Sequence, residues 1–221
     1  MAFDVLDEHE QGELVQKWLR ENALAIAAGI GLGLVLIFGW QQWKVHRTTQ
    51  NAAAAAQYQA LTDAVEAKRP EDALKVAEAI RNDYPKSTYA VLAALQQADI
   101  AITKNDLATA QQALEFARQN AAIDSLANLV SLRIARVKLA QGDADGAIKL
   151  VDALPAGEYG ALAGELRGDA LLKLGRTDEA RTAYQQALAK FSDRAPQGRN
   201  VLQMKLEDLG GTAPATETPA S

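Results

Sequence analysis

The clearest feature of the hydrophobic pattern is a run of 22 residues without any charge, from Asn22 to Trp43. Its middle reads ALAIAAGIGLGLVLIFGW. As an α-helix the run extends about 33 Å, which is enough to cross a hydrocarbon layer of about 30 Å. Trp40 and Trp43 lie where the run meets the next basic residues, the position at which aromatic side chains anchor at a membrane interface. The pattern predicts a single transmembrane helix over residues 23–43.

A cleaved signal peptide is the competing interpretation, because the five alanines at 52–56 resemble a small-residue cleavage site. However, residues 1–22 contain two basic and six acidic side chains, whereas a signal peptide begins with a basic segment. The apolar run is also longer than usual, and Trp43, Lys44 and Arg47 separate it from those alanines. These features favour a retained membrane helix. Two basic residues on each flank leave its orientation undecided.

Ala25, Gly29 and Gly33 recur at four-residue spacing within the run. Such a stripe of small residues lets a second transmembrane helix approach closely, so these three are candidate helix-packing positions. Gly and Ala are also common in membrane helices generally, and that explanation carries equal weight. The glycines do not complete a dinucleotide-binding fingerprint, because Leu34 takes the place of its last glycine and no strand precedes it.

After residue 50 the chain is rich in alanine with helical periodicity, and its turn signals recur at long intervals. Four segments align on a turn followed by a helix with an early alanine, spaced 37, 37 and 33 residues apart: Ala73, Ala110, Ala147 and Ala180. The helix before each turn aligns on Leu61, Ala98, Ala135 and Gly168, and the helix after it on Ala77, Leu114, Val151 and Tyr184. This resembles the tetratricopeptide pattern, in which small residues let paired helices close together, although no unit has its first-helix Trp.

The interpretation is an all-α protein, with a single transmembrane helix followed by a tetratricopeptide-like helical-repeat solenoid of about four degenerate helix pairs. An ordinary helical bundle would explain the alanine content but not the recurrent turns. A last amphipathic helix over residues 196–209 is expected to cap the solenoid with one apolar side, formed by Val201, Leu202, Leu206 and Leu209. Residues 210–221 are small, polar and Pro-containing, and we expect a disordered tail there.

Composition excludes several function classes. Hydrophobic residues make up 48% of the chain and aromatic residues only 5%, the mixture expected of packed helices. From residue 44 on there are 21 basic and 22 acidic side chains, so no excess of positive charge is available for nucleic acid. The chain has no cysteine, which excludes disulfides and thiolate chemistry.

Catalytic chemistry finds no support in the residue pattern. The two histidines, His9 and His46, flank the predicted membrane helix, and neither has a second His at metal-ligand spacing. There is no phosphate-binding loop, nucleophile elbow or zinc spacing. The acidic pairs at 71–72 and 178–179 fall in the first turns of predicted helices, where the helix dipole favours negative charge. We predict a protein that is not an enzyme and that has no cofactor, metal or small-molecule substrate.

Two segments carry a family resemblance: SLRIARVKLAQGDADGAIKLVDAL at residues 131–154 and ELRGDALLKLGRTDEARTAY at residues 165–184. In these segments, and in its order of features, the chain resembles the YfgM family of ancillary SecYEG translocon subunits. The resemblance implies a cytoplasmic amphipathic segment over 1–22 and a periplasmic repeat domain over 44–209, anchored in a bacterial inner membrane. It also implies partnership with the SecYEG translocon and with the membrane-anchored periplasmic chaperone PpiD, in the handover of newly translocated proteins.

The leading functional hypothesis is therefore a membrane-anchored adaptor for protein–protein interaction at the Sec translocon, where tethering makes modest affinities sufficient. The alternative is a stress-response regulator that acts through its acidic cytoplasmic amino-terminal segment. In that segment Leu6, Leu14, Trp18 and Leu19 supply part of an apolar face.

The first helix of each pair lines the concave face of a tetratricopeptide-like superhelix. Counting from the aligned alanines, that face presents Tyr58, Leu92, Leu95, Leu129, Leu132, Leu162 and Glu165. An exposed apolar groove usually marks a partner site, so we predict that it receives an amphipathic or extended segment of a partner. The alternatives are a shifted register, or a last helix that fills the groove through Leu202 and Leu206. Arg133 and Arg136 suit a partner's carboxylates, but such residues more commonly form local ion pairs on a solvated face.

Overall fold

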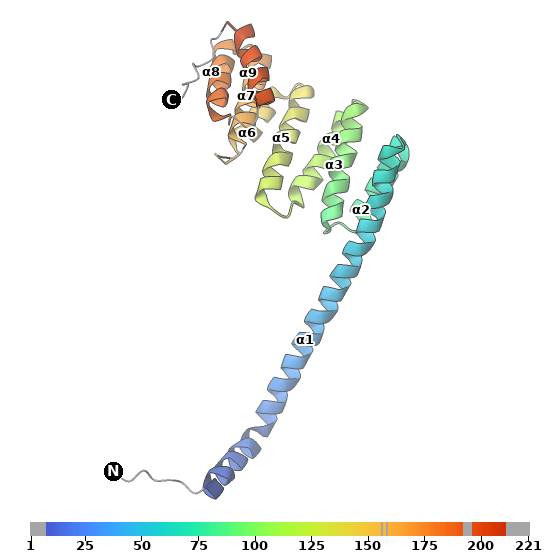
Figure 1. Cartoon of the computed structure of the whole chain (residues 1–221), viewed down its shortest axis with the longest axis vertical. Helices are drawn as coiled ribbons and strands as arrows, with labels where there is room; N and C mark the ends of the chain where they lie inside the picture. Colours follow the sequence, from blue (N-terminus) through green and yellow to red (C-terminus); the bar gives the residue numbers. More distant parts are fainter. Residues whose placement is uncertain (1–7, 156, 158, 192–195, 211–221) are drawn as a thin grey trace, which may run out of the picture. The chain divides into compact units, whose positions relative to one another are not determined.

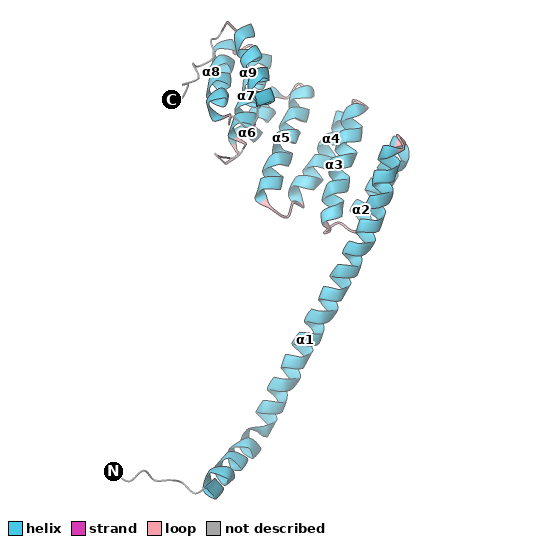
Figure 2. Ribbon diagram, in the orientation of Figure 1, coloured by secondary structure: helices cyan, strands magenta, loops and turns pink. Residues whose placement is uncertain are grey.

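A computed structural model of the chain describes residues 8–155, 157, 159–191 and 196–210. Within these residues all regular secondary structure is helical (Figure 2). The chain divides into two compact units, residues 1–50 and residues 51–221.

The described part of the first unit belongs to one long helix. Helix α1 spans Glu8–Glu66 and supplies every described residue of this unit (Figure 1). It is long and apolar enough to cross a membrane, with a mean hydropathy of 2.2 in its most apolar window. Near the end of the apolar run the Arg47 guanidinium lies 5.4 Å from the centroid of the Trp43 ring, and the Trp40 ring lies 5.7 Å from the Trp43 ring. A cation over an aromatic ring suits the boundary between hydrocarbon and water.

The second unit is built from consecutive helix pairs followed by a single helix (Figure 1). The end of α1 packs on α2, and α3 pairs with α4, α5 with α6, and α7 with α8, while α9 packs on α8. Each second helix also packs on the first helix of the next pair. The bounds are α2 Pro70–Asp83, α3 Thr88–Thr103, α4 Leu107–Gln119, α5 Asp124–Ala140, α6 Ala144–Asp152, α7 Gly160–Lys173, α8 Thr177–Lys190 and α9 Pro196–Asp208.

The turn inside each pair has the same backbone geometry four times over. A residue with positive φ follows the first helix, and these residues are Lys68, Asn105, Gly142 and Gly175, with φ of 53°, 58°, 89° and 74°. In the third pair the Gly142 amide donates to the Leu139 carbonyl at 3.1 Å and the Asp143 amide to the Lys138 carbonyl at 2.9 Å, and the other turns repeat this pattern. This is the Schellman ending of a helix, in which a left-handed residue lets the last carbonyls find donors. Each such residue precedes the aligned alanine by five positions, so the turns recur at the predicted spacing.

The second helices begin in two chemical ways. The side chains of Asp106 and Asp143 each accept a hydrogen bond from the amide three residues later, at 3.1 and 2.9 Å. Such aspartate caps satisfy amides that have no partner inside the helix. Arg69 and Arg176 take the same position in the first and last pairs, and each forms an ion pair with an acidic side chain in the first turn. The first-turn acids predicted at 71–72 and 178–179 are confirmed.

Small residues at the aligned positions let the paired helices approach closely. The four aligned alanines are 0% exposed. The aligned positions of the first helices are buried too: Leu61, Ala98, Ala135 and Gly168. Alanine has good helix propensity and a side chain of one methyl group, so it fills a close contact without weakening the helix. Burial of every aligned position confirms the predicted register.

The last pair shows the closest approach. A Cβ atom on Gly168 would lie 2.3 Å from Cε1 of the Tyr184 ring, and one on Gly164 would lie 2.8 Å from Cβ of Ala187. The ring of Tyr184, which is 1% exposed, therefore packs directly on the bare backbone of α7. Its hydroxyl donates a hydrogen bond to Oδ1 of Asp169 at 2.7 Å.

The all-α fold and the tetratricopeptide-like repeats are confirmed, and the predicted capping helix is α9. Leu202 and Leu206 are fully buried, but Val201 is 48% exposed and does not share their side, which corrects the predicted apolar face. Helix α1 has no break near residue 22 or residue 43, so the boundaries between segments 1–22, 23–43 and 44–209 remain predictions. Of the predicted tail, residues 211–221 lie outside the described residues.

We predict that Ala180→Leu destabilises the second unit by about 1–3 kcal/mol, because added atoms force packed helices apart. The measurement is thermal unfolding of the full chain in detergent micelles, followed by circular dichroism. Ala189→Leu is the matched control, since Ala189 lies exposed on the same helix. Equal melting of the two variants would contradict the close approach of α7 and α8.

Candidate partner-binding surfaces

Five of the seven residues predicted for the first-helix face offer partly accessible apolar surface. Leu129 is 39% exposed, and four others are half-buried: Tyr58, Leu92, Leu95 and Leu162. The Tyr58 ring lies beside the Tyr89 ring, with centroids 5.6 Å apart, and Leu95 and Leu162 pack against the edge of the core. Tyr58, Leu95 and Leu162 therefore have both a structural contact and an open side.

Leu132 does not lie on an open face, which corrects the prediction that it lines a groove. It is 2% exposed and packs in the core with Ala135, Ala147 and Leu166. The reason is that α7 packs on both α5 and α6, so the next pair covers the side of α5 that carries Leu132. Periodicity along α5 marks Leu132 as apolar but does not say which neighbouring helix covers it.

Glu165 belongs to a charged cluster that holds the capping helix. Nζ of Lys205, on α9, donates to Oε1 of Glu165 at 2.8 Å and to both carboxylate oxygens of Asp169 at 2.8 Å. Asp169 also accepts the Tyr184 hydroxyl hydrogen bond, and the Lys205 ammonium lies 5.9 Å from the Tyr184 ring centroid. Glu165 is thus engaged within the chain. Lys205 was not among the residues predicted from the sequence. Its position between Leu202 and Leu206, two apolar residues of the predicted capping helix, could have indicated that it lies near the packed side of that helix.

The leucines of the capping helix pack elsewhere than on the first-helix face. Leu202 and Leu206 are buried against Tyr184 and Leu188 of α8. One alternative was that these two leucines fill the groove between the first helices, and the structure shows that they do not. Nε and Nη2 of Arg181 donate to the Leu209 carbonyl at 3.2 and 2.8 Å, and these hydrogen bonds anchor the end of α9. The apolar face of α3 and α5 therefore stays uncovered by this helix.

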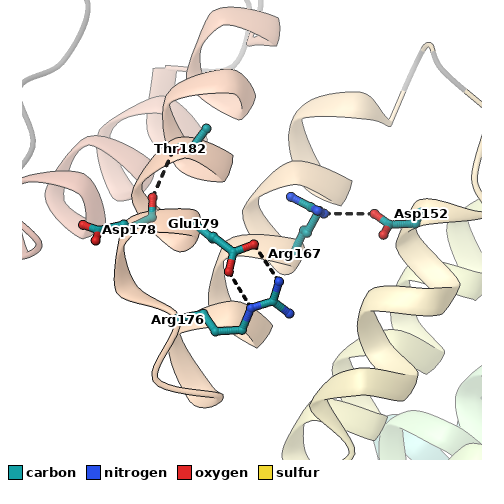
Figure 3. Close-up of polar contacts among 6 residues, drawn as sticks. All are labelled: Asp152, Arg167, Arg176, Asp178, Glu179 and Thr182. Carbon is teal, nitrogen blue, oxygen red and sulfur yellow. Dashed lines mark hydrogen bonds and ion pairs between the residues drawn. The ribbon is translucent and has the colours of Figure 1, made fainter.

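A second surface lies on the other side of the last two pairs, between α6 and α8 over α7. It is a groove of about 480 Å³ that includes Ala183, Ala187 and Lys190. Figure 3 shows its polar edge, where Nε of Arg167 on α7 donates to Asp152 on α6 at 3.0 Å. Residues 156 and 158, in the connection between α6 and α7, lie outside the described residues.

The groove continues toward the start of α8, where the charges are already paired. Arg176 donates two hydrogen bonds to the Glu179 carboxylate, at 2.7 and 2.6 Å (Figure 3). Thr182 donates its hydroxyl to the backbone carbonyl of Asp178 at 3.0 Å. These contacts hold the local structure of α8, so the polar groups here bind each other rather than mark a catalytic site.

Ala25, Gly29 and Gly33 lie on α1 within the apolar run. A Cβ atom on Gly29 or Gly33 would meet nothing within 4 Å, so the chain itself leaves the space beside both glycines open. Their role in packing against another transmembrane helix stays a prediction. Among the residues that the structure describes, no group of three or more His, Asp or Glu side chains is placed to hold a metal ion.

Paired helices with buried small residues, recurrent Schellman turns and a capping helix define the class of tetratricopeptide-like repeat proteins. The family model described as a tetratricopeptide repeat-like domain matches residues 16–211. The ancillary SecYEG translocon subunit of Escherichia coli (strain K12) is 32% identical over 203 residues, which cover 92% of this chain and 97% of that protein. The protein of the same name from Haemophilus influenzae is 28% identical over 209 residues, covering 95% of this chain and 100% of that protein. The chain belongs to the family of ancillary SecYEG translocon subunits, as its segments 131–154 and 165–184 indicated.

Protonation of the Lys205 cluster is linked to stability. Burial by itself lowers the pKa of Lys205, but its hydrogen bonds and attraction to Asp169 and Glu165 outweigh burial, so the pKa is raised overall. Burial, together with the hydrogen bond to Asp169, raises the pKa of the Tyr184 hydroxyl. A raised pKa in the folded state means that the folded chain retains protons that the unfolded chain loses. The contribution is complete below the unfolded pKa values of about 10 and is lost as the pH rises through the folded ones.

We predict that the urea midpoint of the full chain in detergent is lower at about pH 11.5 than at about pH 8, because the unfolded chain then loses protons that the folded cluster retains. Lys205→Met removes the cation and leaves two carboxylates unpaired, so it lowers the unfolding free energy at pH 8 by about 1–3 kcal/mol. The urea midpoint of Lys205→Met should fall less steeply as the pH rises, because this variant already lacks the contribution of the lysine. The control is Lys173→Met, at an exposed lysine of α7. Parallel pH curves for the two variants would contradict the linkage.

Proposed function

We propose that this chain is a membrane-anchored, non-catalytic adaptor at the Sec translocon. The observation that carries the proposal is the combination, in one chain, of a helix able to span a membrane and a tetratricopeptide-like repeat unit. Relatives that match this chain over nearly their whole length are named ancillary SecYEG translocon subunits. Anchoring confines the repeats to the neighbourhood of the translocon, where a high effective concentration makes weak contacts sufficient.

In this proposal the amino terminus is cytoplasmic and the repeats are periplasmic, at the bacterial inner membrane. The repeats hand newly translocated proteins to periplasmic chaperones, with PpiD as the membrane-anchored partner. Support comes from the family membership and from the paired helices of the second unit, a scaffold that presents extended binding surfaces. Four first-helix side chains with accessible apolar surface serve as contacts: Tyr58, Leu92, Leu95 and Leu129. Leu162 contributes at the far end.

The small-residue stripe is proposed to dock a transmembrane helix of the translocon. The four-residue spacing of Ala25, Gly29 and Gly33 along α1 supports this role, because two helix backbones approach most closely where neither carries a bulky side chain. In a bilayer no hydrophobic force separates helix contacts from lipid contacts, so close packing is the main source of affinity.

We predict that a photo-crosslinking residue at Gly29 captures a translocon subunit in native membranes. The matched control is Leu34, which lies about 140° around the helix from Gly29. A yield several-fold higher at Gly29 is expected, because only that side faces the partner. Equal yields at the two positions would remove the stripe from the proposal. The absence of translocon subunits from both would overturn the adaptor function.

We also predict that protease added to spheroplasts digests the repeats while the amino-terminal segment is protected. The measurement is immunoblotting with one tag at each end of the chain. A cytoplasmic protein must stay intact as a control for leakage. Digestion confined to the first 20 or so residues before the predicted membrane helix would mean that the orientation is inverted.

A further inference from the structure

A small apolar hollow lies where the end of α3, the start of α4 and one face of α5 meet. Its volume is about 260 Å³, and its walls are the side chains of Ile102, Leu107, Val137 and Ala140. Small-molecule sites begin at about 300 Å³, so this hollow suits one or two aliphatic side chains rather than a cofactor. Ile102 is 42% exposed, although it lies on a helix whose other apolar residues are mostly buried.

Two arginines stand on the rim of the hollow. Arg133 and Arg136 line it together with Val137 and Ala140, and this spacing puts all four on one face of α5. The pair is particular to this repeat. The same two register positions hold Gln59 and Thr62, Gln96 and Asp99, and Leu166 and Asp169 in the other first helices.

Among the residues that the structure describes, only one of the two arginines on this rim has a carboxylate partner. Nη2 of Arg133 donates to Oδ1 of Asp99 on α3 at 2.7 Å. Asp169 lies at the register position of Arg136 on the next first helix, α7. Its carboxylate already accepts hydrogen bonds from Lys205 and Tyr184. Arg136 is exposed and, within the described part of the chain, forms no hydrogen bond or ion pair.

We propose that this hollow binds a segment of a partner protein in which an aliphatic side chain lies beside a carboxylate. The aliphatic group enters between Ile102 and Val137, and the carboxylate meets Arg136. A guanidinium binds a carboxylate through two parallel hydrogen bonds, which fixes geometry as well as charge. The inference deepens the adaptor function and rests on it, because it states which chemistry the repeats recognise.

The test measures fluorescence anisotropy of labelled peptides with the purified full chain in detergent micelles. The probe is a peptide of about ten residues in which leucine and glutamate alternate with serine, a length that spans one or two repeats. One comparison peptide has every glutamate replaced by lysine, and another has every leucine replaced by serine. We expect binding of the first peptide only, since both the apolar group and the negative charge are required.

Arg136→Glu should weaken binding of the acidic peptide by about tenfold or more, because it replaces an attraction with a repulsion. The same variant should gain affinity for the lysine peptide, an exchange that a merely damaged fold would not produce. The matched control is Lys149→Glu, an equal charge change at an exposed lysine of α6. Ile102→Ser should weaken binding without reversing the charge preference.

Equal binding of the acidic and basic peptides, or unchanged affinity in Arg136→Glu, would overturn the proposal. If labelled short-chain phosphatidylglycerol binds and the acidic peptide does not, a lipid head group is the ligand and the proposal is likewise overturned. Either result leaves the crosslink from Gly29 to the translocon untouched. Failure of this inference is therefore distinguishable from failure of the adaptor function.

Discussion

Close approach of the two helices in each pair is the constraint on which the repeat unit depends. Alanine supplies it in three pairs, and in the fourth the backbone of Gly168 accepts the ring of Tyr184. Larger side chains complete the core around these close contacts, and Leu61, Leu114 and Leu171 among them are fully buried. The spacing inside a pair thus sets where the core can lie and which faces remain outside it.

The end of the solenoid shows how polar groups compensate for a missing neighbour. A last pair has no following first helix, so α9 takes that place with two buried leucines. One ammonium group then satisfies two carboxylates of α7, in a partly buried position where charge-assisted hydrogen bonds are strong. This arrangement gives the terminal pair a defined capping surface. It also removes Glu165 and Asp169 from the charges available to a partner.

The same packing rule separates the two sides of the unit. Between the first pairs, the Arg81 guanidinium of α2 lies 4.5 Å from the Phe116 ring centroid and donates to Gln97. Between the last pairs, the corresponding positions carry Arg167 and Gln186, and a groove stays open. On the first-helix side, accessible apolar side chains lie beside Arg136, which has no ion-pair partner among the described residues. Accessible surfaces on a rigid scaffold are where repeat proteins commonly bind their partners.

The sequence by itself determined the class of fold and its register. A long uncharged run, alanines at fixed spacing and turn signals five residues before them are local patterns, and each reports the backbone that it forms. The sequence also indicated the family, through two segments in the third and fourth pairs. Only the tertiary structure decided which apolar positions are open. Leu132 and Leu129 lie on the same helix and are both leucines, yet α6 and α7 cover the first and leave the second 39% exposed. In the same way, Arg133 and Arg136 are indistinguishable in sequence, but Asp99 pairs with only one of them. Exposure and charge balance depend on residues of other helices, some of them 36 positions away, and no pattern within a single helix reports such neighbours.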